Sequence, residues 1–488
     1  MMKTAYRVSV GLVSVLASAC GSDKGLAPVR RAPALSAVTV TANEWNALSV
    51  IAQFQVSNAD SARLLYRSAT EAEQATPFSP TSGAMIRLAA LGLRASTRYR
   101  ITVESMGAGG TTRSDDMDVE TGALPEAIRG LRLAVTGAAS PGYTLVVPVY
   151  LDRSPGAFMI AFDEAGDIRW YRSFPGEGWA VEAKQHPNGH FTTYVGRSYG
   201  WQPNAGRYVE VTPSGEEVRT FRAAAPAWTD PHEMLLSFQD TVLTAAHLLS
   251  YEIRPLDLRA VGGAADTPVA LHSIVRQGAT GATEFVWNAA DYFDVSDWPG
   301  TAGPSYDLVH PSSLALDRDG NYIASFQAVD QIAKIDAQSG NILWRFGGKR
   351  NEFTLLDDPL GGFRGQHSVR VLANGNLLLM DNHIRSPATT SRAVEYSLDA
   401  ATRTARLVWE YRPDPAIASP IMGSVQRLKN GNTLVAFGVA GQAVEVDPAG
   451  RVVWRAALTD NASPMPALGA PELYRAIRIG SLYRYLMP

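Results

Sequence analysis

The chain has 488 residues, of which 46% are hydrophobic and 19% are charged. Lys and Arg number 44 and Asp and Glu number 47, so no strong net charge attracts nucleic acid, and we exclude nucleic-acid binding. The 42 Gly and 29 Pro are scattered among short apolar runs, which favours many strands joined by turns over disorder.

Residues 1–19 have the pattern of a lipoprotein-type export signal. Lys3 and Arg7 precede an apolar stretch at 8–16, and small residues then lead to Cys20, the only cysteine. About nine apolar residues are too few to span a bilayer, which needs roughly twenty. The site resembles a lipobox, although Ala17 stands where Leu is usual. We expect acylation of Cys20 and an exported protein held at a membrane by lipid. The alternative is a plain secretory signal with a chance cysteine.

Residues 20–34 predict a tether, and residues 35–124 predict a small β-sandwich. Runs at 36–40, 48–56 and 99–103 alternate apolar and polar residues, as half-buried strands do. The stretch 91–110 resembles fibronectin type III domains, in which Leu, Thr and Tyr at the spacing of Leu93, Thr97 and Tyr99 form the corner before the sixth strand. The resemblance implies that the Tyr99 hydroxyl bonds to nearby backbone and is structural.

Residues 127–488 repeat two phrases. One is a strand entered through an Asn-Gly turn, as in HPNGHFTTYV and KNGNTLVAFG, and the other is a hairpin ending in a bulky residue, as in IDAQSGNILWRF. Turns at Asp319, Asn374 and Asn430 lie about 55 residues apart, which gives about six repeats. We expect the first phrase in inner strands and the second in outer hairpins whose Trp packs between blades. The predicted fold is all-β, an about six-bladed β-propeller preceded by the sandwich.

Three of the eight histidines precede a strand at a similar point of the repeat, namely His232, His310 and His367. Residues that lead into the innermost strands of a propeller gather at one mouth of its channel. We therefore expect the three imidazoles to meet in one pocket. The alternative is that each histidine is a surface or core residue bound to backbone.

Two patterns with metal-like spacing predict turns instead. The DRDGN string at Asp317 lacks the downstream Glu of a calcium loop, and His186 and His190 are separated by Pro-Asn-Gly. No phosphate-binding loop, dinucleotide fingerprint or serine-hydrolase elbow is present. We expect neither a metal nor a cofactor.

The propeller region resembles the bacterial arylsulfotransferase family, most specifically from Tyr306 to Arg412. The shared features are a strand ending WRFGG, a Gln-His pair at 366–367, an Asp-Asn pair at 381–382 and the stretch SRAVEY. The resemblance implies an aryl sulfotransferase without a phosphosulfate donor, acting on phenols and aryl sulfates. It implies that His367 accepts the sulfuryl group and that His232 and His310 bind sulfate or assist the leaving group. It leaves the oligomeric state open.

Neutral imidazole suits this chemistry, because it is a good nucleophile near pH 7 and the sulfo-imidazolium that it forms is a good donor. Two further imidazoles can move the phenol proton, each contributing about two to four orders of magnitude.

One position departs from the family. Gln327 stands where members carry an arginine that holds sulfate oxygens, and Gln donates hydrogen bonds but no charge. Arg385 or Arg392 could supply the missing cation, or neither. We take Gln327, Arg385, Arg392 and Asn382 as candidate substrate-binding residues. The departure leaves two alternatives to a transferase: a non-catalytic envelope propeller that serves as a binding scaffold, and an aryl sulfate hydrolase.

Overall fold

The computed structural model describes residues 31–83, 85–149, 156–197, 206–299, 307–384, 390–460 and 471–484. The described part is built of β-strands. Its helical segments are short 3-10 turns at Glu126–Ile128, Arg259–Val261, Ala289–Asp291, Val295–Asp297 and Gln327–Val329. Within these ranges no helix has the length and apolar character needed to cross a membrane. Cys20 lies outside the described residues.

The N-terminal strands form a β-sandwich of two sheets. One sheet has the order β1 (Ala34–Ala42), β2 (Val50–Ser57) and β6 (Ile86–Ala90). The other is built on β3 (Ser61–Ser68) and β7 (Arg98–Gly107), which pair with β4 (Gln74–Ala75), β5 (Ser79–Pro80), β8 (Gly110–Arg113) and β9 (Met117–Glu120). The hydroxyl of buried Tyr99 accepts a hydrogen bond from the Arg94 backbone N–H at 3.0 Å, as expected. The likeness to fibronectin type III domains stays a prediction.

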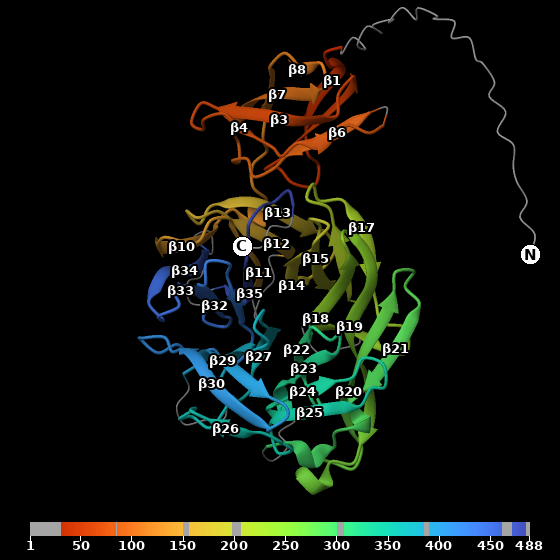
Figure 1. The fold of residues 1–488 in the computed structure, drawn as a ribbon, viewed down its shortest axis with the longest axis vertical. Coiled ribbons are helices and arrows are strands. Elements are labelled where there is room, and N and C mark those ends of the chain that lie inside the picture. The colour runs from red at the N-terminus through yellow and green to blue at the C-terminus, as the bar shows by residue number, and fades with distance from the viewer. Residues whose placement is uncertain are drawn as a thin grey trace, which may run out of the picture.

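Six further sheets form a six-bladed β-propeller, which confirms the predicted fold class (Figure 1). The first three blades contain β11 (Tyr143–Val149), β12 (Ala157–Phe162), β13 (Ile168–Phe174) and β35 (Glu472–Ile479); β14 (Trp179–Gln185), β15 (Phe191–Gly196), β16 (Arg207–Val211) and β17 (Glu217–Phe221); and β18 (Trp228–Gln239), β19 (Val242–Leu256), β20 (Thr267–Gly278) and β21 (Thr283–Asn288).

The remaining three blades complete the ring. They contain β22 (Pro311–Leu316), β23 (Tyr322–Phe326), β24 (Gln331–Ile335) and β25 (Ile342–Gly347); β26 (Thr354–Leu356), β27 (His367–Val371), β28 (Leu377–Asp381), β29 (Arg392–Asp399) and β30 (Thr404–Tyr411); and β10 (Leu131–Gly137), β31 (Ser424–Arg427), β32 (Thr433–Phe437), β33 (Gln442–Val446) and β34 (Val452–Asp460).

Both ends of the propeller sequence help to close the ring. The C-terminal strand β35 pairs with β11 as the inner strand of the first blade, and β10 extends the outer edge of the last blade beside β34. The inner strands β35, β14, β18, β22, β27 and β31 each contact the next around a closed ring. Inner strands of a propeller run in one direction. Their first residues therefore meet at one end of the channel, here named the histidine end, and their last residues meet at the far end.

The outer hairpins lock neighbouring blades together, as the repeat pattern predicted. Trp170 on β13 is fully buried and stacks on Phe191 of the next blade, with ring centroids 4.8 Å apart. Its Nε1 donates a hydrogen bond to the Pro213 carbonyl oxygen at 2.8 Å. Interlocked blades hold the inner strands in fixed positions around the channel.

The sandwich is joined to the propeller by polar contacts near β13 and β17 (Figure 1). Nδ2 of Asn43 donates to the Ser214 carbonyl oxygen at 2.7 Å, and Arg169 lies 3.1 Å from Glu71. These contacts attach the sandwich to outer strands and turns of the blades, so the inner strands are left to form the channel.

Candidate active site

His367 is the first residue of β27 and lies at the histidine end of the channel. Its Nδ1 is 2.8 Å from Oδ1 of Asn382 and 3.1 Å from the Gly365 carbonyl oxygen. Nδ2 of Asn382 donates to the carbonyl oxygens of Ser419 and Met422 at 2.7 and 2.9 Å. Because those two oxygens can only accept, the amide oxygen of Asn382 must face His367. Nδ1 of His367 therefore carries the proton, and Nε2 keeps its lone pair.

Nε2 is the nucleophilic atom of the His367 ring. The Met422 backbone N–H approaches it at 3.4 Å, which is long for a hydrogen bond and leaves the lone pair weakly engaged. The residue is 5% exposed. Burial, together with the charges of His310 and His232, lowers the pKa of His367 to about 3. The imidazole is therefore neutral throughout the physiological pH range.

His232 and His310 lie beside each other, with ring centroids 4.6 Å apart. An aspartate just before each histidine holds it: Nδ1 of His232 is 2.8 Å from Asp230, and Nδ1 of His310 is 2.7 Å from Asp307. The same carboxylates accept the backbone N–H of the histidines that they orient. Since an ionised carboxylate only accepts, each Nδ1 carries a proton and each Nε2 is the nitrogen whose protonation can change.

A fourth histidine, His272 on β20, connects the two aspartates. Its Nε2 lies 3.2 Å from Oδ2 of Asp230, and its Nδ1 lies 3.2 Å from Oδ1 of Asp307. The side chain is 2% exposed, so little water screens these contacts. One continuous set of polar contacts therefore runs from the ring of His232 to the ring of His310.

These groups set one another's charge. Burial disfavours the charged form of His272, but Asp307 and Asp230 outweigh it and raise the pKa of His272 to about 9. Burial also disfavours ionisation of the two aspartates, yet the neighbouring histidines hold the pKa of both carboxyls well below the usual range. Burial lowers the pKa of His232. At neutral pH, His272 is therefore a cation between two carboxylates.

Gln327 is brought together with the histidines. Its backbone N–H donates to the His310 carbonyl oxygen at 2.8 Å. The Gln327 side chain lies beside Gly365, because a Cβ built on Gly365 would be 3.4 Å from Nε2 of Gln327. The carbonyl oxygen of Gly365 in turn contacts His367. Gly365 has a φ of 62°, and a Cβ there would meet Ile384 at 2.3 Å, so only glycine fits. Gln327 can offer amide donors here, but no charge.

Two other predicted substrate-binding residues have different roles in the structure. Asn382 uses its amide within the protein and positions His367, as described above. Arg392 is fully buried, and its five N–H donors are engaged by Asp358, Asp381, Glu410 and the Gly362 carbonyl oxygen. It has no donor left for a sulfate, which speaks against the alternative in which Arg392 supplies the missing cation. Arg385 lies outside the described residues.

Asp230, Asp307 and His272 are not among the site residues predicted from the sequence. A local signal existed for the aspartates, because each lies two or three residues before a candidate histidine, as in DPH and DLVH. No local signal marks His272, which lies within a long strand and meets the aspartates only through the fold.

Among the residues that the structure describes, no group of side chains is arranged to hold a metal ion.

The raised pKa of His272 predicts a pH-dependent contribution to stability. At pH values below 6.5, the ordinary pKa of histidine, protonation of His272 makes its full contribution to the stability of the fold. This contribution is lost as the pH rises through about 9. The free-energy difference between the wild type and His272→Gln, measured by urea unfolding, should therefore shrink by about 3 kcal/mol over this range. His186→Gln is the control, because burial lowers the pKa of His186 to about 3 and it stays neutral throughout. If the loss of unfolding free energy in His272→Gln does not change with pH, His272 is not the protonated group between Asp230 and Asp307.

Comparison with known proteins identifies the family. Residues 138–461, about two-thirds of the chain, match the family model described as arylsulfotransferase (ASST). A search of curated proteins finds no match. Similar solved structures include a protein of unknown function from Bacteroides caccae, at 14% identity and TM-score 0.41, covering 69% of this chain and 98% of that one. A streptogramin B lyase matches at 12% identity and TM-score 0.37, covering 69% of this chain and 91% of that one. Such distant structural similarity carries no information about function. The match to the family model covers most of the propeller, and it shows that the protein belongs to the arylsulfotransferase family.

Proposed function

We propose that this protein transfers a sulfuryl group from a phenolic sulfate ester to a phenol through a sulfohistidine at His367. The observation that carries the proposal is the neutral, buried imidazole of His367, whose tautomer Asn382 fixes so that Nε2 keeps its lone pair. An arylsulfotransferase needs such a nucleophile, because a sulfate ester without an activated donor reacts slowly. His232 and His310 provide two further imidazoles at the same end of the channel.

The first half-reaction forms a bond from Nε2 of His367 to sulfur and breaks the bond from sulfur to the aryl oxygen. The electron pair of that bond leaves with the phenol oxygen, which takes a proton from Nε2 of His310 or His232 in its imidazolium form. In the second half-reaction, the same imidazole, now neutral, removes the proton of the acceptor phenol. The phenol oxygen then attacks sulfur, and the bond from nitrogen to sulfur breaks. His367 is neutral again, and atoms and protons balance over the cycle.

The aspartates give the two acid–base imidazoles their orientation. Asp230 and Asp307 hold each Nδ1–H, so that proton exchange with the phenols occurs at Nε2, and they stabilise the imidazolium when it forms. His232 and His272 hold the pKa of Asp230 well below its usual range, and His272 and His310 do the same for Asp307, so both carboxylates are ionised. The amide of Gln327 offers donors to the sulfate oxygens.

We further propose that the protein acts at a cell-envelope membrane, with Cys20 acylated after cleavage of residues 1–19. The support is the sequence pattern alone: an apolar core too short to span a bilayer, followed by small residues and a single cysteine.

Exchange between a chromogenic aryl sulfate and an added phenol tests the proposed reaction. Wild-type protein should release the chromogenic phenol only when an acceptor phenol is present, and His367→Ala should lower the rate on the order of a thousandfold or more. His190→Ala is the control, because His190 lies in the turn after β14, where it contacts Glu210. Release without an acceptor indicates hydrolysis, and no release by the wild type indicates a non-catalytic propeller; either result contradicts the proposal.

Substitutions at Gln327 test how sulfate is held. Gln327→Arg should leave the exchange rate intact or raise it, because a guanidinium adds charge to the amide's hydrogen-bonding function. Gln327→Leu removes the donors and should lower kcat/KM on the order of tenfold. The rates of both variants are measured by steady-state kinetics with the same aryl sulfate. Strong loss of activity in Gln327→Arg, with Gln327→Leu unaffected, shows that sulfate does not bind beside this residue.

A further inference from the structure

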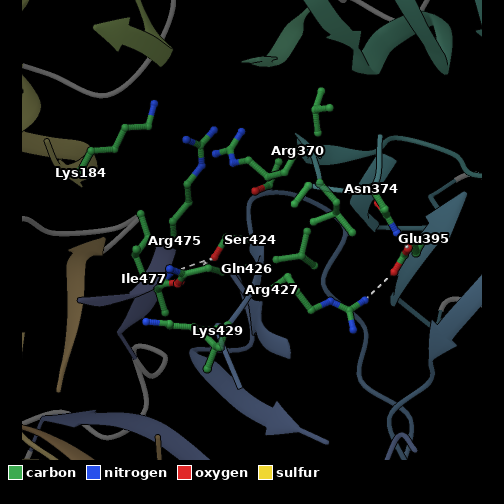
Figure 2. Close-up of a pocket in the computed structure, with 17 residues that line it drawn as sticks. Lys184, Arg370, Asn374, Glu395, Ser424, Gln426, Arg427, Lys429, Arg475 and Ile477 are labelled. Atoms are coloured by element: carbon green, nitrogen blue, oxygen red, sulfur yellow. Dashed lines mark hydrogen bonds and ion pairs between the residues drawn. The ribbon is translucent and has the colours of Figure 1, made fainter. Parts of the chain in front are cut away.

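The far end of the channel holds a cavity of about 850 Å³, which is in the size range of small-molecule sites (Figure 2). It is lined by residues of the inner strands β14, β27, β31 and β35, of the turns after β27 and β31, and by Glu395 of β29. Ala373 and Lys429 on those turns are exposed, so the cavity reaches the solvent there. Nothing in the proposed sulfuryl transfer uses this space.

Much of the wall of the cavity is apolar. Val371, Leu372, Val425, Leu428 and Ile477 line it, and Val425 and Leu428 are buried. An apolar wall of this kind favours a ligand with a hydrocarbon or aromatic body, because contact removes apolar surface from water.

A charge cluster borders the inner end of the cavity. Arg475 lies 3.2 Å from Glu182 and 3.0 Å from Glu233, Arg370 lies 3.1 Å from Glu233, and Lys184 lies 2.7 Å from Glu182 and also contacts Glu233. Figure 2 shows Lys184, Arg370 and Arg475 extending toward one another. Three cations thus share two fully buried carboxylates in the described part of the chain, which leaves one excess positive charge beside the cavity.

Ser368, two residues before Arg370, adds an unused hydrogen-bonding group to the lining of the cavity. It lines the cavity, it is fully buried, and its Oγ has no hydrogen-bond partner among the described residues. A buried hydroxyl without a hydrogen-bond partner is destabilising, because it has lost its contacts with water. An anionic oxygen placed between Ser368 and Arg370 accepts from that hydroxyl and compensates the excess charge.

The charge cluster separates this cavity from the histidines. Glu233 follows His232 on β18, Arg370 lies three residues beyond His367 on β27, and Arg475 donates to the His232 carbonyl oxygen at 2.9 Å. The cluster therefore lies between the histidine end and the cavity. At the outer side of the cavity, Arg427 is neutralised by Glu395 at 2.6 Å, and Lys429 is exposed at the rim. The uncompensated cation that water screens least is therefore at the inner end.

We propose that this cavity is a second binding site, for an organic anion with an apolar body and a single anionic head such as a carboxylate or sulfonate. The head binds between Ser368 and Arg370, where a cation is in excess. The body extends along Val371, Val425 and Ile477 toward the rim at Ala373. The site is independent of the sulfuryl transfer, so its occupancy is measurable whether or not that reaction takes place.

Titration calorimetry of the full chain with octanoate tests the site. The wild type should bind octanoate saturably, and uncharged 1-octanol should bind at least tenfold more weakly. Arg370→Met should weaken octanoate binding at least tenfold, because it removes the excess charge. Glu233 still pairs with Lys184 and Arg475 in this variant, so no buried carboxylate is left unpaired. Arg406→Met is the matched control, because Arg406 is exposed and, within the described ranges, its ion pair is with exposed Asp357.

A second pair of variants blocks the rim and keeps the test decisive if Arg370→Met does not fold. Ala373→Trp should weaken octanoate binding, whereas Arg318→Trp, at the equivalent turn position of the blade that starts with β22, should not. The proposal is overturned if octanoate does not bind saturably, if 1-octanol binds equally well, or if affinity is unchanged in the folded Arg370→Met or Ala373→Trp protein. Octanoate that competes with the aryl sulfate donor also overturns it, because the ligand then sits at the histidine end.

Discussion

The hydrogen bond from Nδ1 of His367 to Oδ1 of Asn382 is the interaction on which the proposed sulfuryl transfer depends. Imidazole has two nitrogens, and only the one without a proton can attack sulfur. Asn382 makes that choice because its other end is committed to the carbonyl oxygens of Ser419 and Met422, in the segment that leads to β31. A single amide thus joins two neighbouring blades and fixes a tautomer. Burial then keeps the ring neutral, so Nε2 of His367 is free of a proton at any pH near neutrality, as the proposed attack on sulfur requires.

The channel is organised in layers along the inner strands. Imidazoles lie at the histidine end, a cluster of three cations and two carboxylates follows, and the cavity occupies the far end. Buried charges are costly unless they are paired. The structure meets this cost in two ways: His272 lies between Asp230 and Asp307, and Glu182 and Glu233 are surrounded by cations. The same pairs that make these charges tolerable also orient His232 and His310 and divide the channel into two compartments.

The sequence predicted the propeller and an approach of histidines from separate blades, which His232 and His310 show, because both follow from periodicity. Asn-Gly turns recur once per blade, and residues that lead into inner strands converge whatever their separation in the chain. His272 could not be predicted, since its contact with Asp307 depends on the long strands β19 and β20. No turn residues in the sequence indicate how long these strands are. Arg392 was misjudged for the opposite reason: its place near the Asp381–Asn382 pair in sequence suggested the site, but its guanidinium is bound by Asp358 and Glu410 as well as Asp381. Sequence proximity does not show which way a side chain points.

The covalent intermediate is the most direct measure of this account. The protein is mixed with an aryl sulfate in the absence of acceptor, quenched within one turnover at alkaline pH, and digested for peptide mass spectrometry. The account predicts a sulfuryl adduct on His367, bonded through Nε2, that disappears when a phenol is added before the quench. An enzyme that exchanges sulfuryl groups while the His367 peptide stays unmodified, or one that carries the adduct on His232 or His310, contradicts it.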